Sequence, residues 1–392
     1  MSAPALNLRL VRGARHVPRK QWDALARRGI HRHAWFVTAE ACGAEPSHVG
    51  VYRGGKLVAL IPAYIERETR HRDLHSRWYG PADRVAAALG ASLRPSITIG
   101  APMSTSSDPL GTENVLTETV LDEALDVLET EARSVGAKTI VWPLVDASAT
   151  TIREVARARG YRESFARAEA VIGIEWKSAE QYLASRSRNV QRTLRNELAW
   201  VHDQGIRISW ETDLRPHAEQ FDALYRASYL ARTGHAADLA SDFFSELAKQ
   251  RSPDIRVQCA WKGATLLQMA VALEGGGALD LCMSAQSDET SRGLLHQHCL
   301  CYDPVRTAIE GGLTLIHLGP GELYEKSLRG ARLNTKVSLV RGLTPVASAA
   351  VRVLAPITNA RNRARHRRLV GRITAENAAP WFATPSSSVP RV

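Results

Sequence analysis

Residues 311–321 read Gly311-Gly312-Leu313-Thr314-Leu315-Ile316-His317-Leu318-Gly319-Pro320-Gly321. The two leading glycines predict the end of a helix that begins near Gly293 and that Pro304 can kink. The apolar run after them predicts a buried strand, and the Gly-Pro-Gly sequence predicts a sharp turn. A strand that follows a helix so closely is typical of the α/β class.

The first half of the chain shows the same order of signals. A helix capped by Thr112 or Asn114 is expected to reach Ser134, and Gly136 ends it before the apolar strand 137–144. A hairpin with a small turn precedes each copy, at Gly54-Gly55-Lys56 and at Lys262-Gly263. We therefore predict a duplicated α/β unit with mixed sheets, in which the first copy carries a longer connection.

Three segments follow from this repeat. We predict a degenerate N-terminal domain over 1–165, a catalytic domain over 166–342 and a basic, Pro/Ser-rich extension over 343–392. The extension is expected to begin with a basic helix over 348–372 that Pro356 interrupts, and to end in a disordered tail over 378–392.

The composition is that of an ordinary globular protein. Of 392 residues, 44% are hydrophobic and 23% are charged, so a large core forms without disulfides or a structural metal. The five cysteines contain no C-x-x-C pair and fit a reducing compartment. Cys299 and Cys301 lie beside His296 and His298, but the spacing matches no zinc pattern, and no metal is predicted.

Charge and hydropathy bear on location and partners. The sequence shows no signal peptide and no apolar stretch of the ~18 residues that a transmembrane segment needs, so we expect a cytoplasmic protein. The net charge of +11 predicts an anionic partner, such as a CoA-type donor, an acidic carrier protein, a tRNA or a membrane surface.

Four stretches of the second half carry a family resemblance. They are 182–195 (YLASRSRNVQRTLR), 221–233 with Tyr225 and Tyr229, 293–296 (GLLH) and 319–330 (GPGELYEKSLRG). The chain resembles the FemAB-like N-acyltransferases of the GNAT acetyltransferase superfamily over about 180–342, and more weakly over 15–165. The resemblance implies a tandem GNAT architecture and acyl transfer to an amine. Related enzymes use acyl-CoA, acyl-carrier thioesters or aminoacyl-tRNA.

Amide formation requires an aligned neutral amine, a base that takes its proton and a donor for the oxyanion. His317 lies in the second-half strand, and Glu322 and Tyr324 follow the Gly-Pro-Gly turn, where side chains line the mouth of a cleft. We predict His317 or Glu322 as the base and Tyr324 as the donor to the leaving group or oxyanion. The alternatives are a core histidine, a turn carboxylate and a packing tyrosine.

Two further side chains are catalytic candidates. Asp280 stands between Leu279 and Leu281 on a predicted strand, and a half-buried carboxylate must be paired or functional. His296 stands at the start of the helix that begins near Gly293.

Donor binding is assigned to two basic groups. Lys326 and Arg329 are three residues apart and share one side of a helix. A second group on one helix face suits phosphates, an acidic carrier or tRNA, and consists of Arg188, Arg192 and Arg195. The second half contains no glycine-rich phosphate loop that would favour CoA in particular.

The first half is expected to be non-catalytic. Its strand carries Trp142 and Pro143 where the second half has His317 and Leu318. We expect it to form one wall of the acceptor site, with Trp78 and Tyr79 as contributors.

The leading prediction is an N-acyltransferase that moves an acyl group from acyl-CoA or an acyl-carrier protein to an amine. The thioester is a co-substrate, and no other cofactor is expected. The acceptor is a peptide, an amino sugar or another amine. One alternative is aminoacyl-tRNA-dependent peptide-bond formation, although the segment 214–250 is too short for the helical hairpin of such cell-wall enzymes. The other is a non-catalytic scaffold with a basic nucleic-acid-binding surface.

Overall fold

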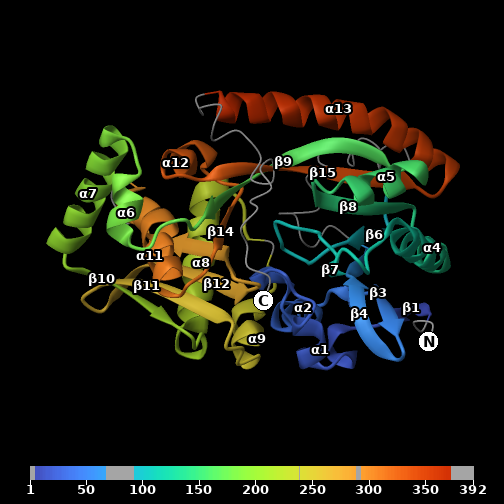
Figure 1. The fold of residues 1–392 in the computed structure, drawn as a ribbon, viewed down its shortest axis with the longest axis horizontal. Helices are drawn as coiled ribbons and strands as arrows, with labels where there is room; N and C mark the ends of the chain where they lie inside the picture. Colours follow the sequence, from blue (N-terminus) through green and yellow to red (C-terminus); the bar gives the residue numbers. More distant parts are fainter. Residues whose placement is uncertain (1–4, 68–91, 238, 288–292, 372–392) are drawn as a thin grey trace.

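The computed structural model of the chain describes residues 5–67, 92–237, 239–287 and 293–371. Trp78, Tyr79 and the tail 378–392, which the sequence analysis singled out, lie outside the described residues. Within those residues the strands form two sheets, one of four strands and one of eleven (Figure 1).

The small sheet has the order β1-β3-β4-β7. Its strands are β1 (Leu6–Val11), β3 (His48–Arg53), β4 (Lys56–Ile61) and β7 (Leu110–Gly111). The predicted hairpin turn at Gly54-Gly55 joins β3 to β4, and both glycines have the positive φ that such a turn requires. The returning strand of this hairpin breaks at Pro62, which has no N–H for a sheet, and the residues from Ala63 onward enter the large sheet.

The large sheet runs the length of the molecule in the order β10-β11-β12-β13-β14-β9-β15-β8-β6-β5-β2. In that order its strands are β10 (Ile206–Glu211), β11 (Ile255–Lys262), β12 (Thr265–Gly275), β13 (Ala278–Gln286), β14 (Leu315–Gly319), β9 (Arg162–Gly173), β15 (Arg332–Gly342), β8 (Thr139–Asp146), β6 (Ser96–Ile99), β5 (Ala63–Glu66) and β2 (Glu45–Pro46). The β13–β14 and β6–β8 pairs are parallel and the others are antiparallel, which confirms the predicted α/β class with mixed sheets.

Two strands join the halves. β15, near the end of the described chain, lies between β9 and β8 and pairs with both. The predicted boundary between residues 165 and 166 lies inside β9, so one continuous sheet crosses it. The division into domains stays a prediction.

Helices cover both faces of the sheets (Figure 1). Their bounds are α1 (Arg19–Asp23), α2 (His33–Ala41), α4 (Glu118–Ser134), α5 (Thr150–Ala158), α6 (Ala179–Ala184), α7 (Arg188–Asp203), α8 (Ala218–Thr233), α9 (Phe243–Lys249), α10 (Leu294–Gln297), α11 (Asp303–Glu310), α12 (Leu323–Leu328) and α13 (Pro345–Val370). A π-helical stretch, His298–Tyr302, joins α10 to α11, so the helix predicted before Gly311 forms. No helix of the described residues is long and apolar enough to cross a membrane.

Two predicted helices differ in detail. α4 begins at Glu118 because Thr117, and not Thr112 or Asn114, caps it by accepting from the Val120 N–H. Pro356 does not interrupt α13, which continues through it. Pro356 is exposed on the outer side of that helix, where solvent can reach the carbonyl that loses its partner.

Candidate active site

The β13–β14 pair places two predicted residues side by side. The strands pair over three positions only, and the last pair is Asp280 with His317. β13 then continues along β12, and β14 along β9, with no further β13–β14 pair among the described residues. The side chains over 281–284 are only half-buried although β13 is an interior strand. The two strands therefore separate directly beyond Asp280 and His317.

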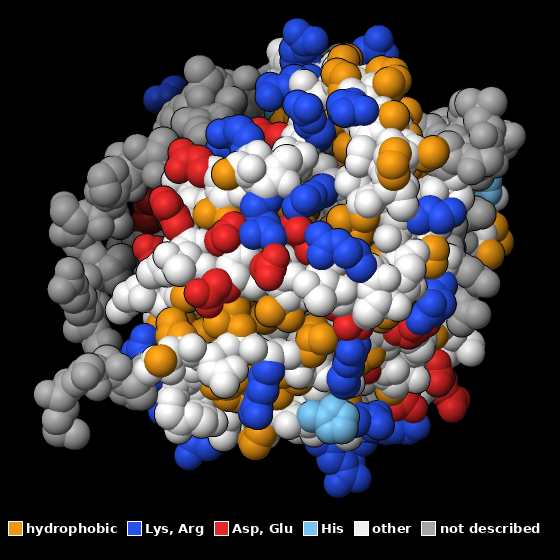
Figure 2. Space-filling view, turned by 90° about the vertical axis from the view of Figure 1, so that its right-hand side faces the viewer, with side chains coloured by type: hydrophobic (Ala, Val, Ile, Leu, Met, Phe, Trp, Pro, Cys, Tyr) orange, Lys and Arg blue, Asp and Glu red, His pale blue; other side chains and the backbone are white. Residues whose placement is uncertain are grey.

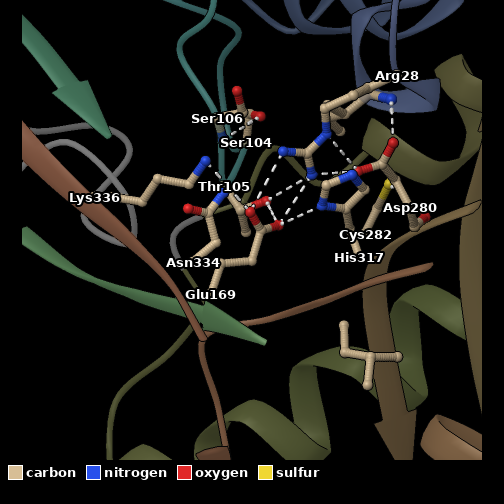
Figure 3. A network of polar contacts seen from close by, with 12 residues as sticks. Arg28, Ser104, Thr105, Ser106, Glu169, Asp280, Cys282, His317, Asn334 and Lys336 are labelled. Carbon is tan, nitrogen blue, oxygen red and sulfur yellow. Dashed lines mark hydrogen bonds and ion pairs between the residues drawn. The ribbon is translucent and has the colours of Figure 1, made fainter. Parts of the chain in front are cut away.

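Arg28 links this point to the middle of the sheet (Figure 3). Its Nε lies 3.0 Å from Asp280 Oδ1, and its Nη2 lies 2.9 Å from Glu169 Oε1. All three residues are less than a tenth exposed. Because buried charges are costly unless paired, the two carboxylates and the guanidinium depend on one another.

The loop that carries Arg28 is fixed by contacts with the second half. A side chain at Gly29 would meet the Leu273 carbonyl oxygen at 2.0 Å, so this close approach to β12 requires glycine. The Ile30 N–H donates to Asp280 Oδ2 at 3.3 Å, and Trp22 Nε1 donates to the His31 carbonyl at 2.9 Å. The N-terminal half thus holds Arg28 in a defined position.

The network keeps its groups charged. Burial alone would raise the pKa of Glu169, but Arg28, His317 and Lys336 outweigh it and hold that pKa well below its ordinary value. The pKa of Asp280 is likewise lowered, because Arg28 and His317 outweigh the effect of burial. Burial opposes the charge of Arg28, yet both carboxylates raise its pKa. The site therefore contains a fixed, ionised carboxylate–guanidinium array.

Two buried histidines face this array. His317 Nδ1 lies 3.4 Å from Glu169 Oε1, and neither ring nitrogen has a hydrogen-bond partner of good geometry in the described part of the chain. His31 is 2% exposed, and neither of its ring nitrogens has such a partner there. Burial, and then the charge of Arg28, lower the pKa of His31 to about 4, so its ring is neutral near pH 7. Buried polar atoms without partners are rare and concentrate at functional sites.

A second layer of polar groups supports Glu169. Thr105 Oγ1 donates to Glu169 Oε1 at 2.6 Å, and Lys336 Nζ lies 3.5 Å from Glu169 Oε2. Lys336 also lies 3.3 Å from Asp146 Oδ2, to which Asn334 Nδ2 donates. These groups come from β8, β9, β15 and the loop before β7, so the sheet itself positions the carboxylate.

The same side chains have ligand atoms close enough for a metal ion. Glu169, Asp280 and His317 each offer one within 4.8 Å of the others. However, Arg28 forms ion pairs with both Glu169 and Asp280, and its positive charge disfavours a cation at this place. A second such group, Glu211, His217 and Cys259, is built around a 2.9 Å His217–Glu211 ion pair.

The predicted catalytic residues fall into two neighbouring groups. His317 and Asp280 belong to the buried network, whereas His296 Nε2 lies 3.6 Å from Glu322 Oε2 in a more exposed pair. Gln297 Nε2 donates to the same Glu322 oxygen at 2.6 Å. Tyr324 is half-buried in the first turn of α12.

The predicted donor-binding residues also divide. Lys326 Nζ donates to the Leu318 carbonyl at 2.5 Å, and Arg329 is paired with Glu197, both inside the protein. Their charged ends hold α12 against β14 and α7, and the assignment of these two residues to donor binding stays a prediction. The arginines of α7 are exposed as expected, and their role stays a prediction; they are Arg188, Arg192 and Arg195.

Sequence reasoning missed four members of the network. Glu169 stands between Ala168 and Ala170, a signal like the one that singled out Asp280, whereas the two residues before Lys336 in its strand are polar. Arg28 and His31 lie at the two ends of a single 3-10 turn, and no pattern in the sequence marks them. The first half supplies both residues, so the candidate site is built from the two halves of the chain.

Comparison with solved structures shows the fold. The C-terminal domain assigned to a lysylphosphatidylglycerol synthetase from Agrobacterium fabrum matches with a TM-score of 0.54 at 12% identity, covering 86% of this chain and 95% of that one. FemX matches with a TM-score of 0.54 at 14% identity, covering 84% and 96%. L-PGS from Bacillus licheniformis matches with a TM-score of 0.51 at 12% identity, covering 91% and 97%.

A family model gives the assignment. No curated protein matches the chain. The model of the FemAB-like family, described as peptidoglycan biosynthesis/recognition, matches residues 13–370. This match confirms the resemblance to the FemAB-like family that the sequence analysis stated, and it supports a transferase of acyl or aminoacyl groups. The chain belongs to the FemAB-like family.

Proposed function

We propose that the chain transfers an acyl group from a thioester donor, acyl-CoA or an acyl-carrier protein, to an amine, with His317 as the general base. One observation carries the proposal. His317 lies with Nδ1 3.4 Å from a carboxylate, and both of its ring nitrogens lack a hydrogen bond within the described residues, at the point where two parallel strands separate. An imidazole held in this way by an ionised carboxylate is suited to accept a proton.

The step follows from this arrangement. The amine nitrogen attacks the acyl carbonyl carbon, forming the C–N bond while the C–S bond of the donor breaks. Nε2 of His317 takes the proton from the amine, and Glu169 stabilises the imidazolium. The departing thiolate then recovers that proton. Arg28 keeps Glu169 ionised throughout, so it positions the base and does not itself react.

A second donor class has its own support. The family is described by peptidoglycan biosynthesis/recognition, and FemX shares the fold. Lys326 and Arg329 are also buried, so the exposed arginines of α7 are the more accessible of the predicted donor-binding groups. An aminoacyl ester of tRNA would undergo the same step with a C–O bond breaking, and the α7 arginines would contact its phosphates.

Thermal unfolding with a panel of donors tests the proposal. CoA thioesters of graded chain length and a set of aminoacyl-tRNAs are compared with free CoA and deacylated tRNA. A donor at 100 times its dissociation constant adds about 2.7 kcal/mol to the free energy of unfolding. The class that raises the midpoint is then supplied with a panel of amines, and amide formation is followed by mass spectrometry.

The outcomes separate the alternatives. A shift and transfer with thioesters support the leading proposal, and a shift and transfer with aminoacyl-tRNA alone move it to the second donor class. Salt-dependent binding of any nucleic acid, with no transfer from either donor class, would establish the non-catalytic alternative.

A further inference from the structure

α13 has two unlike faces. Its inner face buries Ala347, Val351 and Ala355 against β9 and β15, and the helix lies across the top of the molecule (Figure 1). On the opposite face Val346, Val353 and Ile357 are 58%, 61% and 58% exposed. The spacing of seven and four residues places these three side chains in one stripe along the helix.

Beyond Ile357 the helix becomes strongly basic, and helical spacing places Arg361, Arg367 and Arg368 nearest the line of the stripe. α13 contains six arginines and no Asp or Glu between residues 345 and 370. The arginines are exposed, and they are Arg352, Arg361, Arg363, Arg365, Arg367 and Arg368. Hydrophobic and basic side chains gather at the top of the view in Figure 2, where α13 lies in Figure 1.

The helix is held firmly enough to present this face. Asn359 Oδ1 accepts from the Phe165 N–H, and Asn362 Nδ2 donates to the Phe165 carbonyl, both at 2.9 Å. The guanidinium of Arg363 lies 5.5 Å from the centre of the Phe165 ring, and the His366 ring lies 4.9 Å from it. The outer stripe takes no part in these contacts, so the fold does not account for its apolar residues.

We propose that the outer face of α13 binds the surface of an anionic lipid bilayer, with the helix lying in the plane of the interface. Exposure of an apolar side chain to water is unfavourable. Burial of the three side chains at the boundary of the acyl chains would therefore lower the free energy. The arginines meet the negative surface potential of the same leaflet. A nucleic acid would satisfy the arginines but would leave the three apolar side chains without a partner. This inference does not depend on the transfer reaction.

Vesicle sedimentation with the full chain tests the proposal. The protein is mixed with vesicles of phosphatidylcholine alone, or of phosphatidylcholine with phosphatidylglycerol, at several salt concentrations. We expect binding to the anionic vesicles only, and we expect it to weaken as salt rises.

Two double variants separate the apolar contribution to vesicle binding from the electrostatic one. Val353→Ser with Ile357→Ser is expected to weaken binding about tenfold through lost apolar contact. Arg367→Gln with Arg368→Gln is expected to weaken it about 25-fold, at roughly fivefold for each arginine near the surface. The matched control is Arg53→Gln with Lys56→Gln, an exposed pair in the β3–β4 hairpin on the opposite side of the molecule (Figure 1).

Three results would overturn the proposal. The first is no binding of the wild-type chain to anionic vesicles. The second is an equal loss in the control and in either α13 variant, which would indicate a response to net charge alone. The third is tighter binding to RNA than to vesicles, with RNA affinity unaffected by the serine substitutions. Unchanged thermal unfolding of each variant verifies that the fold is retained.

Discussion

The two parallel strand pairs of the large sheet share a geometry and differ in chemistry. β6 and β8 pair at Ser96–Thr139, Ile97–Ile140 and Thr98–Val141, again over three positions. The third pair is Thr98 with Val141 in the first half and Asp280 with His317 in the second. Only the second half therefore places titratable groups at the point where the strands separate.

What lies beyond the third pair differs as well. In the first half Trp142 is 1% exposed and donates from Nε1 to the Ser107 carbonyl at 2.8 Å. Its side chain therefore fills the space beyond the Thr98–Val141 pair. In the second half the strand over 281–284 stays half-buried. One fold element thus serves as scaffold in one copy and as candidate site in the other, because function depends on the side chains placed there.

The largest effect is expected when the base is removed from the second pair. His317→Ala should lower kcat/KM about 10²- to 10⁴-fold, the usual contribution of a general base. Thr98→Ser, at the same level of the first pair, should leave transfer close to wild type. Steady-state kinetics with the donor found by thermal unfolding measures both. Equal losses of kcat/KM in the two variants would contradict the claim that only the second strand pair takes part in transfer.

Removing the positive charge of Arg28, which pairs with Asp280 and Glu169, should lower the stability of the fold. Arg28→Met leaves Glu169 and Asp280 buried without their main countercharge, so the free energy of unfolding should fall by about 3–5 kcal/mol. Arg28→Lys keeps the charge but not the fork geometry and should cost less. Chemical denaturation measures the loss. A change below about 0.5 kcal/mol in Arg28→Met would show that the network is not coupled in this way.

Lowering the pH is expected to reduce the free energy of unfolding by a smaller amount. The pKa of His31 is lowered from 6.5 to about 4 in the folded chain, so the unfolded chain binds more protons between these values. Stability should therefore be fully present above pH 6.5 and should decline by roughly 3 kcal/mol as the pH falls toward 4. The lowered pKa values of Glu169 and Asp280 act at still lower pH, since such stability is lost only below their unfolded pKa.

Denaturation at a series of pH values measures the decline. His31→Leu serves as the control and should flatten the curve between pH 4 and 6.5. The same slope in both proteins would assign the decline to other groups.

The smallest effect on stability is expected at the exposed arginines of α7. Replacing Arg188, Arg192 and Arg195 by Gln should change the free energy of unfolding by about 0.5 kcal/mol or less for each residue. If these arginines contact the donor, KM for it should rise with kcat unchanged. A fall in kcat with KM unchanged would instead link α7 to the reacting groups.

The sequence could predict the elements that local patterns specify, but not the contacts that depend on long-range packing. The buried strand that carries His317 and the glycines after each helix depend on local pattern, and both were predicted. β10 was missed although its residues alternate between apolar and polar side chains over Ile206–Glu211, so the local signal for this strand was present. The split at Pro62 depends on two sheets meeting there. Arg28 and His31 enter the site through long-range packing, which a single sequence does not encode in any local period.

Affinity labelling tests the central claim most directly. A bromoacetylated donor, of the class that raises the unfolding midpoint, is incubated with the protein carrying Cys282→Ser, which removes a neighbouring thiol. Peptide mass spectrometry then locates the label. The account predicts alkylation of His317. A label near Thr98 and Val141, or none at His317 although the reagent binds, would contradict it.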